Sequence, residues 1–168
     1  NPLQIGAELY GHAGIDSDAE VVCIMAAVLG LAELDGLTIE LGHMGVFKAL
    51  METAQLDLDA TDKLLDALLR KADDEVVECL QENEVNADSA RHIVGLLSLN
   101  GVVEVLPKAR KVLRGAPTLV LDALDEIEAL LKLLALRIPR VDLHVDLAEL
   151  RGYRYHTGLT FAAYTPGE

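Results

Sequence analysis

The richest set of chemistry-bearing side chains in this sequence lies between residues 142 and 158. It comprises Asp142, His144, Asp146, Arg151, Tyr153, Arg154, Tyr155 and His156. This density of polar groups is typical of a binding pocket, which needs a few converging polar side chains on a rigid, mostly apolar wall. The same spacing also fits the exposed face of an edge strand, where polar and apolar residues alternate. Composition supports the two interpretations equally.

His144 stands between Asp142 and Asp146, and on a strand all three side chains would point to the same side. A metal site needs three or more ligands at fixed geometry. No other part of the sequence supplies a further ligand by its spacing, so we predict no metal site. The other histidines outside this cluster are isolated, and isolated histidines are typical of the surface or of hydrogen-bonded core positions.

Gln4 and Glu8 form a second polar pair, because a strand over residues 3–10 would place both on one face. An amide and a carboxylate on the floor of a sheet can hold an ammonium or imidazole group through charge-assisted hydrogen bonds. The alternative is an exposed strand face, which the residues alone favour slightly.

The sequence lacks the motifs of covalent and cofactor chemistry. It has no serine in a nucleophile elbow, no glycine-rich dinucleotide loop and no P-loop, so we predict no cofactor. Cys23 and Cys79 lie in apolar helical patterns without the spacing of a zinc or dithiol motif. We interpret both as small core residues, which fits a reducing, cytoplasmic compartment.

Composition and charge limit the partners. The formal net charge of the 168 residues is −14, which would repel a phosphate backbone and disfavours binding to tRNA or DNA. No stretch approaches the roughly 20 uninterrupted apolar residues that a membrane span requires. Aromatic residues make up 4% and hydrophobic residues 51%, so aliphatic side chains must form the core.

Hydrophobic periodicity predicts strand, helix and strand at the beginning of the chain. A strand is expected over residues 3–10. Ser17 and Glu20 fit a capping box for a helix that ends near residues 35–36. A second strand is expected over residues 37–41, followed by a glycine-flanked turn and a helix over residues 46–53.

From residue 47 to residue 138 the pattern is helical throughout, with no convincing strand. Within it we expect a helix over residues 73–82, a following helix that Asn86 caps, and a longest helix that begins just after Pro117. Alternation returns after Pro139, at residues 141–145 and 159–163. We therefore predict an α+β fold in three parts: core residues 1–46, a helical insertion at 47–138, and return strands within 139–168. Sequential strands in such a fold are more often antiparallel. The Asn-Pro beginning and the Pro-Gly-Glu end lead us to expect a fragment of a longer protein.

Three segments resemble histidyl-tRNA synthetases. Residues 3–11 with 18–22 are similar to the strand that completes motif 2 of that family and to the helix after it. Residues 151–161, Arg-Gly-Tyr-Arg-Tyr-His-Thr-Gly-Leu-Thr-Phe, resemble the family's histidine-specific Arg-Gly-Leu-Asp-Tyr-Tyr-Thr-Gly segment, and residues 41–45 resemble its short strand and turn. The resemblance implies part of the antiparallel sheet of a class II aminoacyl-tRNA synthetase, without motifs 1 and 3, interrupted by a helical insertion.

The resemblance also implies a pocket for histidine. The positions that match the family's amino-acid pocket are Gln4, Glu8, Arg151 and Tyr155. His156 stands where the family has its second tyrosine, and Arg154 where it has an aspartate. These departures argue against aminoacylation and leave an imidazole-sized pocket that includes His156.

Residues 146–167 are most similar to the regulatory paralogues of ATP phosphoribosyltransferase. This resemblance implies a non-catalytic subunit that pairs with the short catalytic subunit and takes part in feedback by histidine at the first step of histidine biosynthesis. It also implies a homo-oligomer at full length. The alternatives are a histidyl-tRNA synthetase or another histidine-activating enzyme, and a scaffold of unrelated function.

Overall fold

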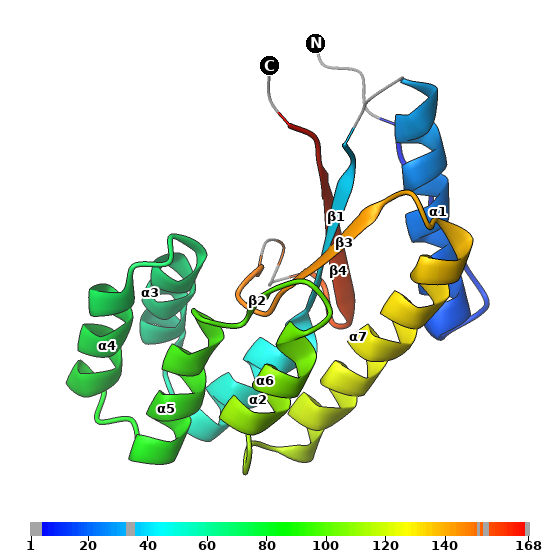
Figure 1. Ribbon diagram of the computed structural model, residues 1–168. Helices are drawn as coiled ribbons and strands as arrows, with labels where there is room; N and C mark the ends of the chain where they lie inside the picture. The colour runs from blue at the N-terminus through cyan, green and yellow to red at the C-terminus, as the bar shows by residue number, and fades with distance from the viewer. Residues whose placement is uncertain (1–4, 33–35, 151, 153–154, 167–168) are drawn as a thin grey trace.

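Seven helices and four strands make up the part of the chain that the structure, a computed structural model, describes: residues 5–32, 36–150, 152 and 155–166 (Figure 1). They are α1 (Ile15–Leu31), β1 (Thr38–His43), α2 (Met44–Ala54), α3 (Leu58–Leu69), α4 (Asp73–Glu82), α5 (Ala87–Leu96), β2 (Asn100–Gly101), α6 (Val105–Val112), α7 (Thr118–Arg137), β3 (Asp142–Asp146) and β4 (Leu159–Tyr164).

The four strands form one sheet in the order β2-β3-β1-β4. β1 lies inside the sheet, parallel to β3 and antiparallel to β4, so that Leu41 lies opposite Val145 and Phe161. β2 pairs antiparallel with the end of β3. The α+β class is as expected, but the parallel pair differs from the antiparallel arrangement that we expected. The long helical segment between β1 and β3 explains it, because a parallel pair needs a crossover connection.

A close backbone approach at Gly42 fixes how the sheet meets the turn after β3. A Cβ atom at Gly42 would lie 2.9 Å from Thr160 Oγ1 and 3.0 Å from the carbonyl oxygen of Glu149. Glycine is therefore required here for lack of space, and the turn packs directly on β1.

The helices cover the sheet and extend beyond it. α1 and α7 pack side by side and contact β4, and α7 also contacts β1 (Figure 1). α2 follows β1 without a loop, because His43 caps it: the Gly45 amide donates to His43 Nδ1 at 3.0 Å. His43 Nε2 therefore carries the proton and donates to Glu126 Oε2 on α7, also at 3.0 Å.

Helices α3 to α5 form a lobe at the left of Figure 1, away from the strands. The start of α3 is capped by Asp57, which accepts from the Ala60 amide at 2.8 Å, and the start of α5 by Asn86, which accepts from the Ser89 amide at 2.9 Å. Buried residues of the lobe belong to the same hydrophobic cluster as those of the sheet. The boundaries of the three predicted parts stay a prediction.

Two predictions at the beginning of the chain are wrong. Residues 5–10, the described part of the expected strand 3–10, form no strand and are exposed, because no described strand pairs with them. The capping box is wrong because α1 begins at Ile15, two residues before Ser17. The Ser17 hydroxyl instead donates to the carbonyl oxygen of His12 at 3.1 Å and lies 2.7 Å from His12 Nδ1.

Predictions for the helical middle are mostly confirmed. α4 has the expected bounds, Asn86 caps α5, and Pro117 stands just before the longest helix. Two details differ: no turn separates β1 from α2, and Asn100–Gly101 form the short strand β2 where we expected no strand. Two residues are too short for a period-2 pattern to appear in the sequence.

We expect Gly42→Ala to lower the free energy of unfolding by about 1–3 kcal/mol, because the added methyl group meets backbone that cannot move aside. Denaturant unfolding of the full-length protein measures this. Gly30→Ala in α1 is the matched control, since a Cβ there meets nothing within 4 Å. Alanine should leave that helix as stable or more stable, by up to about 1 kcal/mol. Equal effects of the two variants would contradict the close approach at Gly42.

Candidate functional site

The turn after β3 is held by Asp146, which is buried. Its Oδ1 accepts from the Ala148 amide at 2.8 Å, and its Oδ2 lies 2.6 Å from Lys71 Nζ. Lys71 follows the end of α3 and has a left-handed backbone with φ of 51°. One carboxylate therefore closes its own turn and joins the sheet to the helical lobe.

Glu40 on β1 lies close enough to Asp146 and Lys71 for their charges to affect its ionisation. Partial burial, and then the negative charges of Asp146 and Glu149, raise the pKa of the Glu40 carboxyl. Lys71 and His144 act in the opposite direction on that pKa but do not cancel the effect. Glu40 is thus the group here whose ionised form is disfavoured by folding.

The segment that leads from this turn to β4 is tied to α2. The Met44 amide donates to the carbonyl oxygen of Gly158 at 2.9 Å, and Lys48 Nζ donates to the carbonyl oxygen of His156 at 2.7 Å. Within the segment, the amides of Tyr155 and His156 both donate to the carbonyl oxygen of Gly152. The first turn of α2 and its lysine thereby position the described part of residues 152–158.

A cavity of about 530 Å³ opens beside this segment. Its lining residues are Glu149, Gly152, His156, Leu159, Thr160, Phe161 and Ala162. Thr160 Oγ1 is buried and has no hydrogen-bond partner among the described residues. A buried hydroxyl without a partner is destabilising by about 1–3 kcal/mol, so a ligand that supplies one would be favoured at this point.

The residues predicted for the histidine pocket are only partly brought together. Gln4 and Arg151 lie outside the described residues. His156 lines the cavity, whereas Tyr155 is 88% exposed and does not. Glu8 is exposed and accepts a hydrogen bond from the Tyr10 hydroxyl. Their joint role in one pocket stays a prediction.

Sequence reasoning missed two residues of this cavity, Thr160 and Glu149. The alternation of β4 places Thr160 on the opposite face from Phe161 and Leu159, but only the packing over Gly42 shows that its hydroxyl is buried. Among the described residues, no group of three or more histidine, cysteine or acidic side chains could hold a metal ion. Asp146, one of the three considered for a metal, is paired with Lys71.

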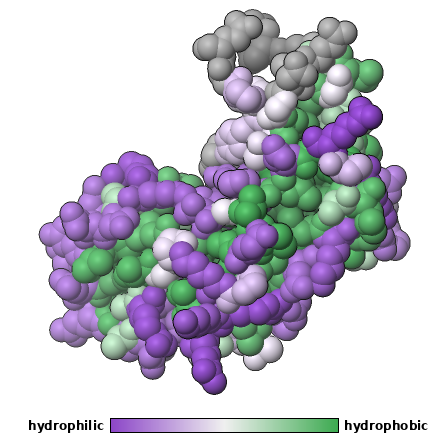
Figure 2. Space-filling view, in the orientation of Figure 1, coloured by the Kyte–Doolittle hydropathy of each residue, from purple (hydrophilic) through white to green (hydrophobic). Residues whose placement is uncertain are grey.

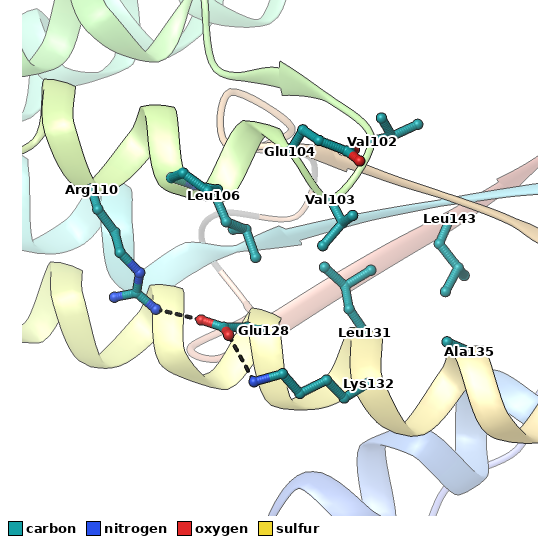
Figure 3. A pocket seen from close by; sticks show the side chains of 11 residues that line it. Val102, Val103, Glu104, Leu106, Arg110, Glu128, Leu131, Lys132, Ala135 and Leu143 are labelled. Carbon is teal, nitrogen blue, oxygen red and sulfur yellow. Dashed lines mark hydrogen bonds and ion pairs between the residues drawn. The ribbon is translucent and has the colours of Figure 1, made fainter.

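A larger hollow of about 690 Å³ lies between the α6 region and α7, and we call it the α6–α7 groove. Figure 3 shows that side chains of three segments face it, and hydrophobic surface runs through the centre of the same face in Figure 2. Its lining residues are Val102, Val103, Glu104, Leu106, Pro107, Arg110, Glu128, Leu131, Lys132, Ala135 and Leu143. The size and apolar lining are those of a binding site.

Charged side chains close one end of the α6–α7 groove. Arg110 lies 2.6 Å from Asp125 and 2.7 Å from Glu128, and Lys132 also lies 2.7 Å from Glu128 (Figure 3). The two basic residues hold the pKa of the Glu128 carboxyl below its usual value. This end of the groove is therefore a paired, electrically balanced cluster.

A family model described as histidyl-tRNA synthetase matches residues 1–168. The chain belongs to the histidyl-tRNA synthetase family. Within the family, it is 46% identical over 167 residues to a protein of Pseudomonas fluorescens named ATP phosphoribosyltransferase regulatory subunit. A protein of the same name from Thioalkalivibrio sulfidiphilus is 41% identical over 167 residues. Both alignments cover 99% of this chain and 42% of the relative, so the chain spans about two fifths of these relatives.

Solved structures agree with this family's fold. A Bacillus halodurans protein described as an ATP phosphoribosyltransferase regulatory subunit/histidyl-tRNA synthetase matches with a TM-score of 0.78 at 24% identity, over 92% of this chain and 40% of that one. A histidyl-tRNA synthetase from Nostoc matches with a TM-score of 0.74 at 16% identity, over 92% and 37%. The ATP phosphoribosyl transferase (HisG:HisZ) complex from Thermotoga maritima gives 0.69 at 18%, over 92% and 53%. The expected synthetase-like fold is confirmed.

No helix among the described residues combines the length and apolar character of a membrane span.

We expect Glu40→Gln to raise the free energy of unfolding at pH 7. The pKa of Glu40 is raised on folding, so the folded state holds its proton to higher pH than the unfolded state does. Stability is therefore lost as pH rises through the folded-state pKa, and the variant removes this loss. The gain should shrink as pH falls toward 4, because the carboxyl becomes increasingly protonated in both states. Urea unfolding from pH 4 to pH 7 measures it.

Glu75→Gln is the control with the opposite sign. A hydrogen bond from Arg70 lowers the pKa of the exposed Glu75 carboxyl, so Glu75 stabilises the fold above its unfolded-state pKa. That contribution is lost as pH falls. The Glu75→Gln variant should therefore be slightly less stable than wild type at pH 7, and this difference should disappear toward pH 4. A Glu40→Gln variant that is destabilised at pH 7 would contradict the unfavourable ionisation of Glu40.

Proposed function

We propose that the protein that carries this chain is the regulatory subunit of ATP phosphoribosyltransferase, acting with a short catalytic subunit at the first step of histidine biosynthesis. The observation that carries the proposal is the name shared by relatives at 41–46% identity across nearly the whole chain. These relatives are longer, so the activity of the whole protein is inferred from a part of it. A cytoplasmic location is part of the same proposal.

The proposal assigns histidine to the cavity beside residues 152–162 as a feedback effector. A neutral imidazole offers one N–H donor and one acceptor nitrogen. The buried Thr160 hydroxyl could donate to the acceptor nitrogen, and His156 lies at the same wall. Gln4, Glu8, Arg151 and Tyr155 would complete the pocket as the family resemblance implies, with a carboxylate for the ammonium group and a guanidinium for the carboxylate.

The chemistry of the chain favours a regulatory role over aminoacylation. A synthetase must hold tRNA, and the net charge of −14 opposes binding of a phosphate backbone. His156 and Arg154 replace a tyrosine and an aspartate of the family's histidine-specific segment. A pocket that binds histidine without activating it would serve as a sensor, provided that histidine and the catalytic subunit influence each other's binding.

The test is reconstitution of activity. The full-length protein is titrated into the short catalytic subunit while formation of phosphoribosyl-ATP is followed, first without histidine and then with it. We expect the catalytic subunit to be activated and histidine to reduce that activation. Failure of the full-length protein to bind or activate the catalytic subunit would overturn the proposed function.

We expect Thr160→Val to weaken histidine binding about tenfold, which is about 1.4 kcal/mol, without loss of stability. Valine has nearly the shape of threonine but cannot donate to the imidazole, and it also removes an unpartnered buried hydroxyl. Calorimetric titration of the full-length protein measures the affinity. Thr165→Val, at an exposed position after β4, is the control. Unchanged affinity in a well-folded Thr160→Val protein, and also in Glu8→Ala and Arg151→Ala, would place histidine elsewhere.

A further inference from the structure

Helix α3 is followed by a residue type that the local backbone does not favour. Lys71, just after the end of α3, has a φ of 51°, in the left-handed region where glycine is the usual residue. Gln55 and Glu84 have the same conformation at the ends of α2 and α4, and neither side chain makes a hydrogen bond or ion pair within the described part of the chain. The conformation alone therefore assigns no role to Lys71, but the contact that its side chain makes sets it apart.

That contact joins the helical lobe to the sheet. Lys71 Nζ donates to Asp146 Oδ2 at 2.6 Å, across 75 residues of sequence. The Asp146 side chain is 7% exposed, and so deeply buried a carboxylate is destabilising unless an opposite charge and hydrogen bonds compensate it. Within the described part of the chain, Lys71 is the cation that pairs with it, and the Ala148 amide donates to its Oδ1. Lys71 therefore holds Asp146 in its buried position.

The turn that begins at Asp146 forms part of the cavity wall. The Glu149 amide donates to the carbonyl oxygen of Asp146 at 3.2 Å, and Glu149 lines the cavity beside residues 152–162. On its other side the turn packs against β1, because a Cβ atom at Gly42 would lie 3.2 and 3.0 Å from the carbonyl oxygens of Asp146 and Glu149. The turn is thus held between Lys71 and Gly42, and its position determines where Glu149 lies in the wall.

Lys71 lies among three carboxylates around this turn. Partial burial, and then the negative charges of Asp146 and Glu149, raise the pKa of the Glu40 carboxyl. Lys71 lowers that pKa, and His144 acts in the same direction. Without Lys71, Asp146 would be a buried carboxylate close to two others and without its ion-pair partner, which is strongly destabilising. A shift of the Asp146 carboxylate toward water would relieve this, and the turn would move with it.

We propose that Lys71 is a positioning residue for the ligand of this cavity: through Asp146 it fixes the turn at residues 146–149, and thereby the part of the wall that Glu149 contributes. Lys71 does not line the cavity, so it acts on the affinity without contact to the ligand. One end of the helical lobe thus takes part in the affinity of a site on the sheet. The identity of the ligand as histidine rests on the proposed function, whereas the contact and the turn do not.

Calorimetric titration of the full-length protein with histidine tests this role. Lys71→Gly suits the left-handed backbone and removes only the side chain, and we expect it to raise the dissociation constant about fivefold or more. Glu84→Gly and Gln55→Gly are the matched controls, since each places glycine at a left-handed helix end whose side chain does not line the cavity. Both controls should bind histidine within about twofold of wild type. Lys71→Arg keeps the positive charge and should restore most of the affinity.

Asp146→Asn tests the same contact from the side of the sheet. Asparagine keeps an oxygen for the Ala148 amide but carries no charge for Lys71. If both residues act through their ion pair, the double variant Lys71→Gly with Asp146→Asn should bind histidine no more weakly than the weaker of the two single variants. Asp146→Asn also takes the place of Lys71→Gly in the comparison with the controls if the glycine variant does not fold.

Hydrogen exchange follows the turn in the protein without ligand. The Ala148 amide donates to the carboxylate that Lys71 holds. We therefore expect this amide to exchange about threefold faster or more in Lys71→Gly than in Glu84→Gly.

The affinity for histidine decides the outcome. If wild type binds histidine and Lys71→Gly binds it as tightly as Glu84→Gly does, the inference is wrong. An affinity that falls without faster exchange at Ala148 would also overturn it, because the effect would not pass through the turn. If the wild-type protein binds no histidine, the proposed role of the cavity fails and the inference fails with it, so the wild-type titration separates the two failures.

Discussion

The absence of a side chain at Gly42 is the constraint on which the site depends. β1 is bordered by β3 and β4. At Gly42 the turn after β3 packs so close to the strand that a Cβ atom would lie 3.0 Å from the carbonyl oxygen of Glu149. This contact buries the hydroxyl of Thr160 and brings Glu149 to the edge of the cavity. β1 then runs directly into α2, whose first turn and Lys48 hold residues 156 and 158. A change in the packing of this turn on β1 would therefore displace several walls of the cavity at the same time.

β3 connects the α6–α7 groove with the cavity beside residues 156–162. Leu143 lines the α6–α7 groove, and Asp146, three residues later, anchors the turn that leads to the cavity that His156 lines. Lys71 ties that same carboxylate to the helical lobe. The walls of the groove and of the cavity thus depend on one short strand.

The sequence predicted the parts of the fold that local chemistry determines. Asn86 and the apolar positions of α4 act within one or two turns of helix, so the α5 cap and the bounds of α4 were correct. The parallel pairing of β1 with β3 and the short strand β2 depend on residues far apart in the chain, and no local period encodes them. The strand expected at residues 3–10 failed for the same reason, because alternation supplies a face but not a partner strand. Within the cavity, His156 followed from the family motif, whereas Thr160 needed the contact at Gly42.

We infer that this synthetase-like chain belongs to a protein that senses histidine rather than activates it. Histidine-dependent ATP–pyrophosphate exchange by the purified full-length protein tests it most directly, with calorimetry on the same sample to establish that histidine is bound. We predict binding without exchange above the background of a protein-free control. Exchange that depends on histidine and ATP would contradict the claim and make this protein a histidine-activating enzyme.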